Sequence, residues 1–281
     1  MTLTNLRPRS KTKPKQTVAT QAQLIAVWGP LGSTGKSTLA LNLAYELAVL
    51  GQRVILLDLD THAPSLNQLL PVRGTSAGLA GAARLIRQGR FTPEELDRLS
   101  HSIKHGRYQF RFLSGLPNAS RWAEITPDTI QQLANIANLN FDIIIADVAS
   151  SLEDSLTSPE SPTSRNASAR TAIRIATQTI AVLAPNQLSI SRYLNAFSTL
   201  DELQKTRTLI LNRGEANHKF TGAIWSLTKE RIEACIPADE PAVQLAEIQQ
   251  LPLALARRKS PARNAIAALA HKLLAWPPSV N

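Results

Sequence analysis

Short apolar runs alternate along this chain with longer segments in which apolar residues recur every three or four positions. The short runs predict buried strands and the longer segments predict amphipathic helices. The strand-like runs are residues 24–28, 53–60, 109–115, 141–148, 179–185 and 208–212. The helical segments are residues 37–51, 77–89, 93–100, 126–138, 166–176, 188–205, 221–235 and 261–274. Apolar strands that alternate with helices are typical of a parallel sheet covered by helices on both faces.

The alternation continues without an internal repeat from residue 23 to residue 276, so we expect one domain over residues 23–276. The polar stretch at residues 150–164 directly follows a strand and is expected to be a loop. Residues 1–22 and 277–281 lack the pattern and are expected to be tails, the first of them basic and disordered. The predicted fold is a single doubly wound α/β domain with a mostly parallel sheet of about seven or eight strands.

The net charge of +10 changes this picture mainly at the N-terminus. The residues before the first strand include five basic side chains and no acidic one. The basic residues are Arg7, Arg9, Lys11, Lys13 and Lys15. Such a segment either keeps the protein in solution or acts as an electrostatic arm that binds DNA without sequence preference.

Composition argues against several classes of protein. The single cysteine, Cys235, permits neither an internal disulfide framework nor a four-cysteine metal site. No apolar run reaches the roughly 20 residues that span a bilayer. No apolar segment follows the basic N-terminus in the manner of a secretion signal. We therefore expect a cytoplasmic protein without a membrane segment.

Residues 29–38 read GPLGSTGKST and lie between the first predicted strand and the first predicted helix. A glycine-rich turn before a helix directs several backbone N–H groups at one point, where the helix N-terminus adds partial positive charge. Lys36 can reach the outer phosphates of a nucleotide, and Ser37 offers a hydroxyl to Mg²⁺. The strict motif has glycine where this chain has Pro30, but the turn can form around the later glycines. The residues expected to hold the nucleotide are Gly32, Ser33, Thr34, Gly35, Lys36, Ser37 and Thr38.

Carboxylates end two of the predicted strands. Asp58 and Asp60 close the 53–60 run, and Asp147 lies near the end of the 141–148 run. In a parallel sheet, ligands bind at the carboxyl ends of the strands. These side chains should therefore lie beside Lys36, as a nucleotide with Mg²⁺ requires. The alternative is that they are ordinary acidic residues at strand ends.

The chain resembles the MinD/ParA group of P-loop ATPases, which position septa, chromosomes and surface machines in prokaryotes. The resemblance runs from residue 24 to about residue 274. It rests on the loop 29–38, the strand FDIIIADV, the segment TLILNRGE and the late stretch that begins IPADEP. It implies a P-loop NTPase fold, ATP or ADP with Mg²⁺ as cofactors, and a slow Mg²⁺-dependent hydrolysis of ATP to ADP and phosphate.

The resemblance also implies roles for individual residues. Lys36 and Asp60 would be catalytic, the first by holding phosphate and the second by polarising or positioning the attacking water. The metal would be held or supported by Ser37, Asp58 and Asp147. The residues that would contact or border the adenine base are Asn212, Arg213, Pro237 and Asp239.

One position departs from the group. The signature lysine of the MinD/ParA group lies five residues before Lys36 and reaches across a dimer to the partner's phosphate, but this chain has Leu31 there. In this respect the loop is nearest to MinD-like and CpaE-like relatives of actinobacterial type, which also lack that lysine. We therefore expect any nucleotide-dependent homodimer to be weakened. Arg165 is a candidate for supplying the missing charge.

The resemblance implies an ATP-dependent positioning or partitioning switch that acts on a chromosome, a septum or a surface machine through an unidentified protein partner. Two alternatives stay open. One is a nucleotide-binding scaffold with negligible hydrolysis that recruits a pilus or division partner, and the other is an accessory protein that binds DNA without sequence preference. Nitrogenase-type iron proteins and iron–sulfur carriers share the predicted fold but need cysteine pairs, so the single Cys235 argues against both.

Overall fold

A computed structural model of the chain describes residues 21–72, 77–153, 164–215 and 218–275. The five basic residues of the predicted N-terminal tail and the predicted tail at 277–281 lie outside these ranges, as does most of the polar stretch at 150–164. None of the described helices is long and apolar enough to cross a membrane.

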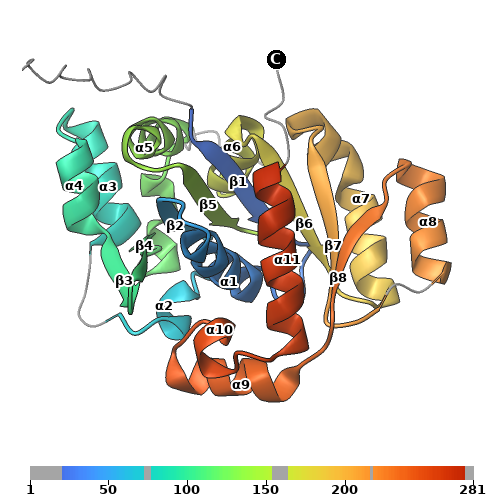
Figure 1. Cartoon of the computed structure of the whole chain (residues 1–281). Helices are drawn as coiled ribbons and strands as arrows, with labels where there is room; N and C mark the ends of the chain where they lie inside the picture. The colour runs from blue at the N-terminus through green and yellow to red at the C-terminus, as the bar shows by residue number, and fades with distance from the viewer. Residues whose placement is uncertain (1–20, 73–76, 154–163, 216–217, 276–281) are drawn as a thin grey trace, which may run out of the picture.

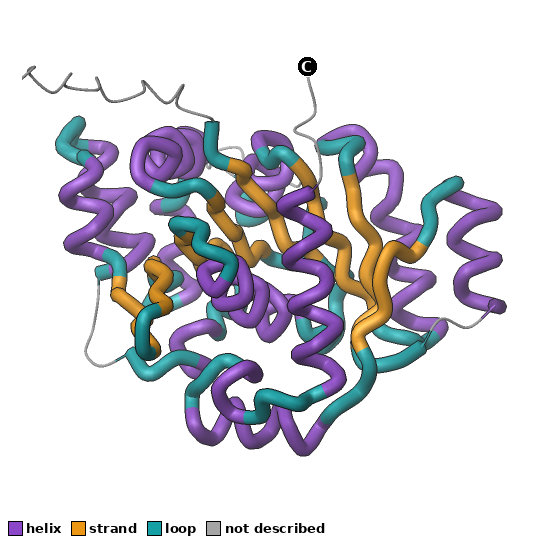
Figure 2. Tube along the Cα trace, in the orientation of Figure 1, coloured by secondary structure: helices purple, strands orange, loops and turns teal. Residues whose placement is uncertain are grey.

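An eight-stranded sheet forms the centre of the molecule (Figures 1 and 2). The strands are β1 Gln23–Trp28, β2 Val54–Leu59, β3 His101–His105, β4 Tyr108–Leu113, β5 Ile143–Val148, β6 Gln178–Leu183, β7 Arg207–Asn212 and β8 Ile232–Ile236. Their order is β3-β4-β2-β5-β1-β6-β7-β8, and only the β3–β4 pair is antiparallel. This confirms the predicted single α/β domain with a mostly parallel sheet.

Helices cover both faces of the sheet. The helices are α1 Lys36–Val49, α2 Leu66–Leu69, α3 Gly78–Arg87, α4 Pro93–Leu99, α5 Pro127–Asn140, α6 Ala167–Ile175, α7 Gln187–Leu203, α8 His218–Thr228, α9 Glu240–Gln249, α10 Leu253–Ala256 and α11 Pro261–Ala275, with a 3₁₀ helix at Ala119–Glu124. Helices α1 and α11 lie together on the face that is in front in Figure 1. Helices α3, α5, α6 and α7 pack on the opposite face.

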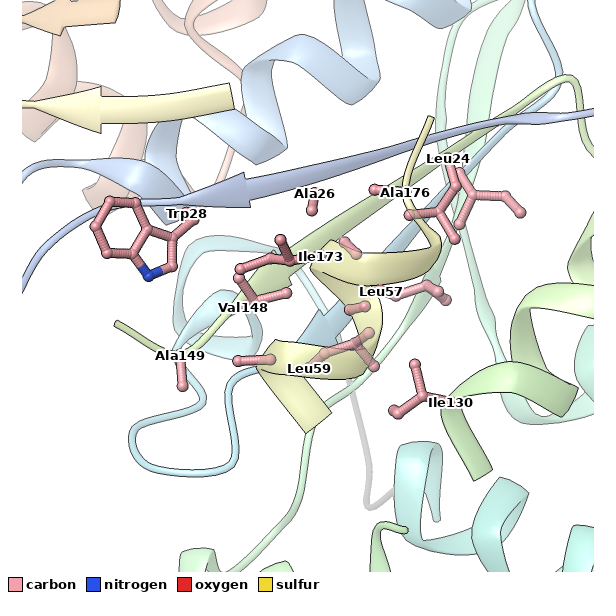
Figure 3. Close-up of a cluster of buried hydrophobic side chains, with 14 of the residues drawn as sticks. Leu24, Ala26, Trp28, Leu57, Leu59, Ile130, Val148, Ala149, Ile173 and Ala176 are labelled. Atoms are coloured by element: carbon pink, nitrogen blue, oxygen red, sulfur yellow. The ribbon is translucent and has the colours of Figure 1, made fainter. Parts of the chain in front are cut away.

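The central strands are mostly apolar on both faces, because each face of the sheet has its own core. In β1, Leu24, Ala26 and Trp28 belong to the core under α6 and α7, and Ile25 and Val27 belong to the core under α1 and α11. Figure 3 shows the first of these groups, with Trp28 at the end of β1. Successive residues of a strand point to opposite faces, so continuous apolar runs follow from burial on both sides.

The sequence-based assignment differs from the structure at several elements, among them helices α2, α9 and α10, which it did not predict. The predicted helix at 221–235 is wrong in its second half, since α8 ends at Thr228, Lys229 follows with a left-handed φ of 61°, and residues 232–236 form β8. Strand β3 was not predicted, because its sequence HSIKH has Ile103 as its single buried residue and shows no apolar run.

Candidate functional site

The predicted site residues converge at the carboxyl ends of the central strands. The loop 29–35 joins β1 to α1 at this edge, and β1 lies between β5 and β6. Strand β5 also pairs with β2, so that Asp58 is the direct cross-strand neighbour of Asp147. Asp60 follows the last residue of β2. The predicted meeting of these carboxylates with the loop is therefore present in the structure.

The loop turns at two glycines, as predicted from the sequence. Gly32 has a φ of 104° and Gly35 a φ of 82°, values that side-chain-bearing residues rarely adopt. A Cβ atom at Gly35 would lie 2.4 Å from the side-chain nitrogen of Asn212, so this position also lacks room for a side chain. Pro30, which replaces the glycine of the strict motif, precedes both of these turns and leaves them intact.

The N-terminus of α1 is open to an anion. Gly35 occupies the cap position, no side chain caps the helix, and its first turn contains no acidic residue. By contrast, α5 is capped by Thr126 and α7 by Asn186. The first N–H groups of a helix need acceptors and carry partial positive charge. A phosphate group supplies such acceptors, so this helix start has the properties of a phosphate site.

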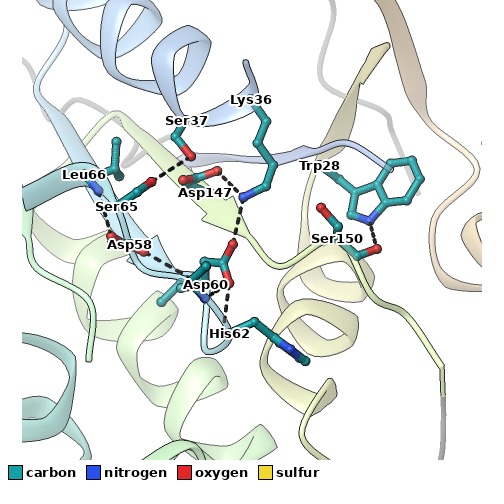
Figure 4. Close-up of polar contacts among 12 residues, drawn as sticks. Trp28, Lys36, Ser37, Asp58, Asp60, His62, Ser65, Leu66, Asp147 and Ser150 are labelled. Carbon is teal, nitrogen blue, oxygen red and sulfur yellow. Dashed lines mark hydrogen bonds and ion pairs between the residues drawn. The ribbon is translucent and has the colours of Figure 1, made fainter. Parts of the chain in front are cut away.

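Lys36 lies between two carboxylates (Figure 4). Its ammonium Nζ donates to Asp60 Oδ2 at 3.0 Å and to Asp147 Oδ1 at 3.2 Å. All three side chains are largely buried, with 13% of Lys36, 9% of Asp60 and none of Asp147 exposed. Burial disfavours the ammonium, but the charges of Asp147 and Asp60 outweigh burial and hold the pKa of Lys36 above its ordinary value.

The carboxylates have different environments and therefore different affinities for protons. Asp60 Oδ1 accepts the backbone N–H groups of His62 and Ala63, each at 2.9 Å. Burial would raise the pKa of Asp60, but the charge of Lys36 and these N–H donors outweigh burial and hold that pKa below its ordinary value. Burial and the charge of Asp147 raise the pKa of Asp58 to about 8. Burial also raises the pKa of Asp147, although the charge of Lys36 opposes this effect.

The residues at this edge fit a nucleotide-bound Mg²⁺ better than a metal held by protein alone. In the parts of the chain that the structure describes, no three His, Cys, Asp or Glu side chains are grouped as a metal site. Asp147 Oδ2 is nevertheless buried without a hydrogen-bond partner, and the Ser37 hydroxyl oxygen accepts a hydrogen bond from the hydroxyl of Ser65 at 3.3 Å. Mg²⁺ binds oxygen ligands and commonly takes one or two carboxylates together with phosphate oxygens. The oxygens present here suit that mode.

A pocket of about 230 Å³ opens beside the loop and contains all four residues predicted near the base. Asn212 donates its side-chain N–H to the carbonyl of Thr34 at 2.8 Å. Arg213 has a left-handed φ of 63° and donates to the carbonyl of Ser33. Pro237 and Asp239 lie across the pocket, where Asp239 Oδ2 is buried without a hydrogen-bond partner. The structure thus brings together residues that are about two hundred positions apart in the sequence.

The structure also shows contacts that sequence reasoning missed. The guanidinium of Arg192, on α7, donates to the carbonyl of Leu31 at 2.6 Å. No motif marks this residue, because α7 follows the loop by more than 150 positions. Leu31 is 60% exposed. Arg165 is placed beside the 60–63 segment, where its carbonyl accepts the Thr61 hydroxyl at 3.2 Å. Its suggested role as a substitute charge stays a prediction.

Several characterised proteins match this chain, iron–sulfur cluster carrier proteins among them. The antiactivator FleN of Pseudomonas aeruginosa is 26% identical over 279 residues, which cover 92% of this chain and 89% of FleN. The chloroplastic iron–sulfur cluster assembly factor HCF101 of Arabidopsis thaliana is 27% identical over 146 residues. That segment covers 44% of this chain and only 26% of the length of HCF101.

Solved structures show the same fold. A ParA family ATPase from Chlorobium tepidum superposes with a TM-score of 0.77 at 20% identity, covering 90% of this chain and 99% of the other. The septum site-determining protein MinD of Pyrococcus horikoshii, complexed with Mg-ADP, superposes with a TM-score of 0.70 at 19% identity, covering 92% of this chain and all of that one. At such identities the likeness establishes the fold.

The family follows from the sequence match itself. Residues 25–246 match the model of the CobQ/CobB/MinD/ParA nucleotide binding domain. The matched range contains the glycine loop, the strand-end carboxylates and the four residues predicted near the base, Asn212, Arg213, Pro237 and Asp239. The chain therefore belongs to the CobQ/CobB/MinD/ParA nucleotide-binding domain family.

Proposed function

We propose that the protein is an ATP-dependent switch. It binds Mg²⁺-ATP at the loop 29–38, hydrolyses it slowly, and presents a different surface to a protein partner before and after hydrolysis. The observation that carries this proposal is the ion pairing of Lys36 with Asp60 and Asp147 beside the uncapped start of α1. A cation held by two carboxylates at an anion site can exchange one set of negative partners for another.

Binding would use the loop amides, Lys36 and the hydroxyl of Ser37. Mg²⁺, held by Ser37 and the phosphates with support from Asp58 and Asp147, would supply positive charge that neutralises the phosphate oxygens. Asp60 would position the attacking water, since its ionised carboxylate is fixed by backbone donors and can accept a hydrogen bond from water.

The adjoining pocket would take the base. Asn212 borders the loop through Thr34 and would hydrogen-bond the edge of adenine. Arg213, Pro237 and Asp239 would border the ring. The unpaired oxygen of Asp239 supports this assignment, because it is a buried acceptor that a nucleobase amino group would satisfy.

Contacts around Asp60 support a route from the phosphate site to the surface. When Lys36 turns from Asp60 to a phosphate, the segment after β2 loses one of its anchors. That segment contacts the start of α6, since the His62 ring Nε2 lies 2.7 Å from the side-chain oxygen of Asn166. A change at Asp60 would therefore reach the surface near α6. The name of FleN, an antiactivator, supports a regulatory protein partner.

Leu31 supports slow turnover. An exposed leucine in the phosphate loop cannot neutralise charge that develops during phosphoryl transfer. The same observation keeps the scaffold alternative open, in which the protein binds nucleotide with negligible hydrolysis. Measured release of phosphate separates the two. DNA binding would depend mainly on residues outside the described ranges.

Calorimetric titration with Mg²⁺-ATP tests the proposal. Wild type is expected to bind, and Lys36→Ala is expected to lose about 1.5–3 kcal/mol of binding free energy, the typical value of a charge-assisted hydrogen bond. Lys104→Ala, which removes the same charge from an exposed position on β3, is the matched control and should bind like wild type. Equal affinity of wild type and Lys36→Ala would contradict the proposal.

A further inference from the structure

Two arginines from separate parts of the chain hold the outer side of the phosphate loop. Arg192 donates its Nη1 hydrogen to the carbonyl of Leu31 at 2.6 Å, and Arg213 donates to the carbonyl of Ser33. The guanidinium of Arg192 also packs closely on the loop, since a Cβ atom at Gly32 would lie 3.2 Å from its Nη1. Both arginines line a pocket of about 180 Å³ with residues 31–34.

The contact between Arg192 and the Leu31 carbonyl affects the direction in which the loop's backbone N–H groups point. A trans peptide points its C=O and N–H in opposite directions. By fixing the carbonyl of Leu31, Arg192 fixes the direction of the N–H of Gly32, which is one of the loop's backbone donors. The backbone at Gly32 has a φ of 104°, and no side chain restricts its conformation. A contact from outside the loop is therefore needed to fix the orientation of this peptide.

The charge of these arginines is not matched by carboxylates. Among the described residues, neither Arg192 nor Arg213 forms an ion pair, whereas Arg207 pairs with Asp201 and Glu230. Lys36 is matched by two carboxylates in this state. The uncompensated positive charge at the loop therefore comes from α7 and from the residue after β7.

We propose that Arg192 is a positioning residue of the nucleotide site, which holds the Leu31–Gly32 peptide and gives the site its preference for ATP over ADP. The proposal rests on the ATP binding argued above. A fixed cation without a carboxylate partner attracts the nucleotide with the greater negative charge, and ATP carries one phosphate more than ADP. Arg192 thus supplies from α7 a charge that Leu31 does not supply from within the loop.

Comparing the affinities for the two nucleotides tests this role. Arg192→Ala, Arg192→Lys and wild type are titrated with Mg²⁺-ATP and with Mg²⁺-ADP by calorimetry. We expect Arg192→Ala to weaken ATP binding about tenfold, as the loss of a charged contact does, and to weaken ADP binding much less. Arg192→Lys keeps the charge and should retain most of the preference. Arg174→Ala, at an exposed arginine on α6, is the control of equal charge and should bind like wild type.

A merely structural role would not change the ratio of the two affinities. Equal weakening of ATP and ADP, or no weakening of either, in a variant that melts like wild type would overturn the proposal. If wild type itself binds neither nucleotide, both the proposed function and this inference are wrong. If wild type binds both and Arg192→Ala leaves their ratio unchanged, this inference alone fails.

Discussion

Replacing Lys36 by methionine should destabilise the nucleotide-free protein. Methionine keeps the apolar stem of the side chain and removes the ammonium, so Asp60 and Asp147 lose their shared partner. Removing one member of a buried ion pair costs about 3–5 kcal/mol, because a buried charge is left uncompensated. Asp60 keeps its two backbone donors, which places the expected loss near the lower end, at about 3 kcal/mol.

Thermal and urea unfolding in the absence of nucleotide measure this loss. For a chain of this size, each kcal/mol corresponds to roughly 2–4 °C in Tm, so the expected decrease is about 6–12 °C near neutral pH. The matched control is Arg53→Met, because Arg53 and Asp142 form an ion pair whose side chains are 62% and 37% exposed. Such exposed pairs contribute at most about 1 kcal/mol.

The effect should depend on pH with a definite sign. In wild type, Lys36 helps to lower the pKa of Asp60, so this contribution is present above the unfolded pKa and is lost as the pH falls. In Lys36→Met the buried carboxylates take up protons more readily, and this relieves the unpaired charge in acid. The difference between wild type and variant should therefore shrink as the pH falls toward and below about 4, the ordinary pKa of an aspartate. A Tm of Lys36→Met that matches that of Arg53→Met at neutral pH would refute the reasoning.

Three further outcomes are expected. The folded state raises the pKa of Asp58 to about 8, above its value in the unfolded chain, so the free energy of unfolding should decrease as the pH rises from about 4 to 8. Asp58→Asn cannot ionise, so its urea unfolding midpoint should depend less on pH over this range. Asp60→Ala should keep most of the affinity for Mg²⁺-ATP and lower phosphate release, and an unchanged rate would show that Asp60 does not act on water. A chain without residues 1–15 should bind random duplex DNA more weakly than the full chain, as measured by fluorescence anisotropy. If all five tail charges engage phosphates, the slope of log K against log salt concentration should be smaller in magnitude by about 4 to 5 than that of the full chain.

The sequence alone was sufficient for the features that depend on neighbouring residues. Mostly apolar runs identified the central strands, because burial on both faces of a sheet favours apolar residues at successive positions. The glycines and Lys36 between a strand and a helix identified the phosphate loop, because its geometry depends on consecutive backbone angles. The carboxylates near Lys36 followed from strand ends that meet at one edge of a parallel sheet.

The sequence failed where local signals were weak. Strand β3 lies at the edge of the sheet and buries only Ile103, so no apolar run marks it. Strand β8 is also at an edge and was assigned to the preceding helix, because a left-handed backbone at Lys229 leaves no signature in the sequence. Edge strands have one neighbour and a less buried surface, which weakens the pattern on which prediction depends.

Tertiary structure decided the details of the site that join distant positions. Only the folded chain shows that Lys36 pairs with Asp60 and Asp147, that Arg192 holds the carbonyl of Leu31, and that Asp239 carries an unpaired oxygen in the adjoining pocket. Each of these features depends on distances between elements separated by many residues. Periodicity reports which face of an element is buried, but the partner of a polar side chain is set by how whole elements pack, and no local pattern carries that information.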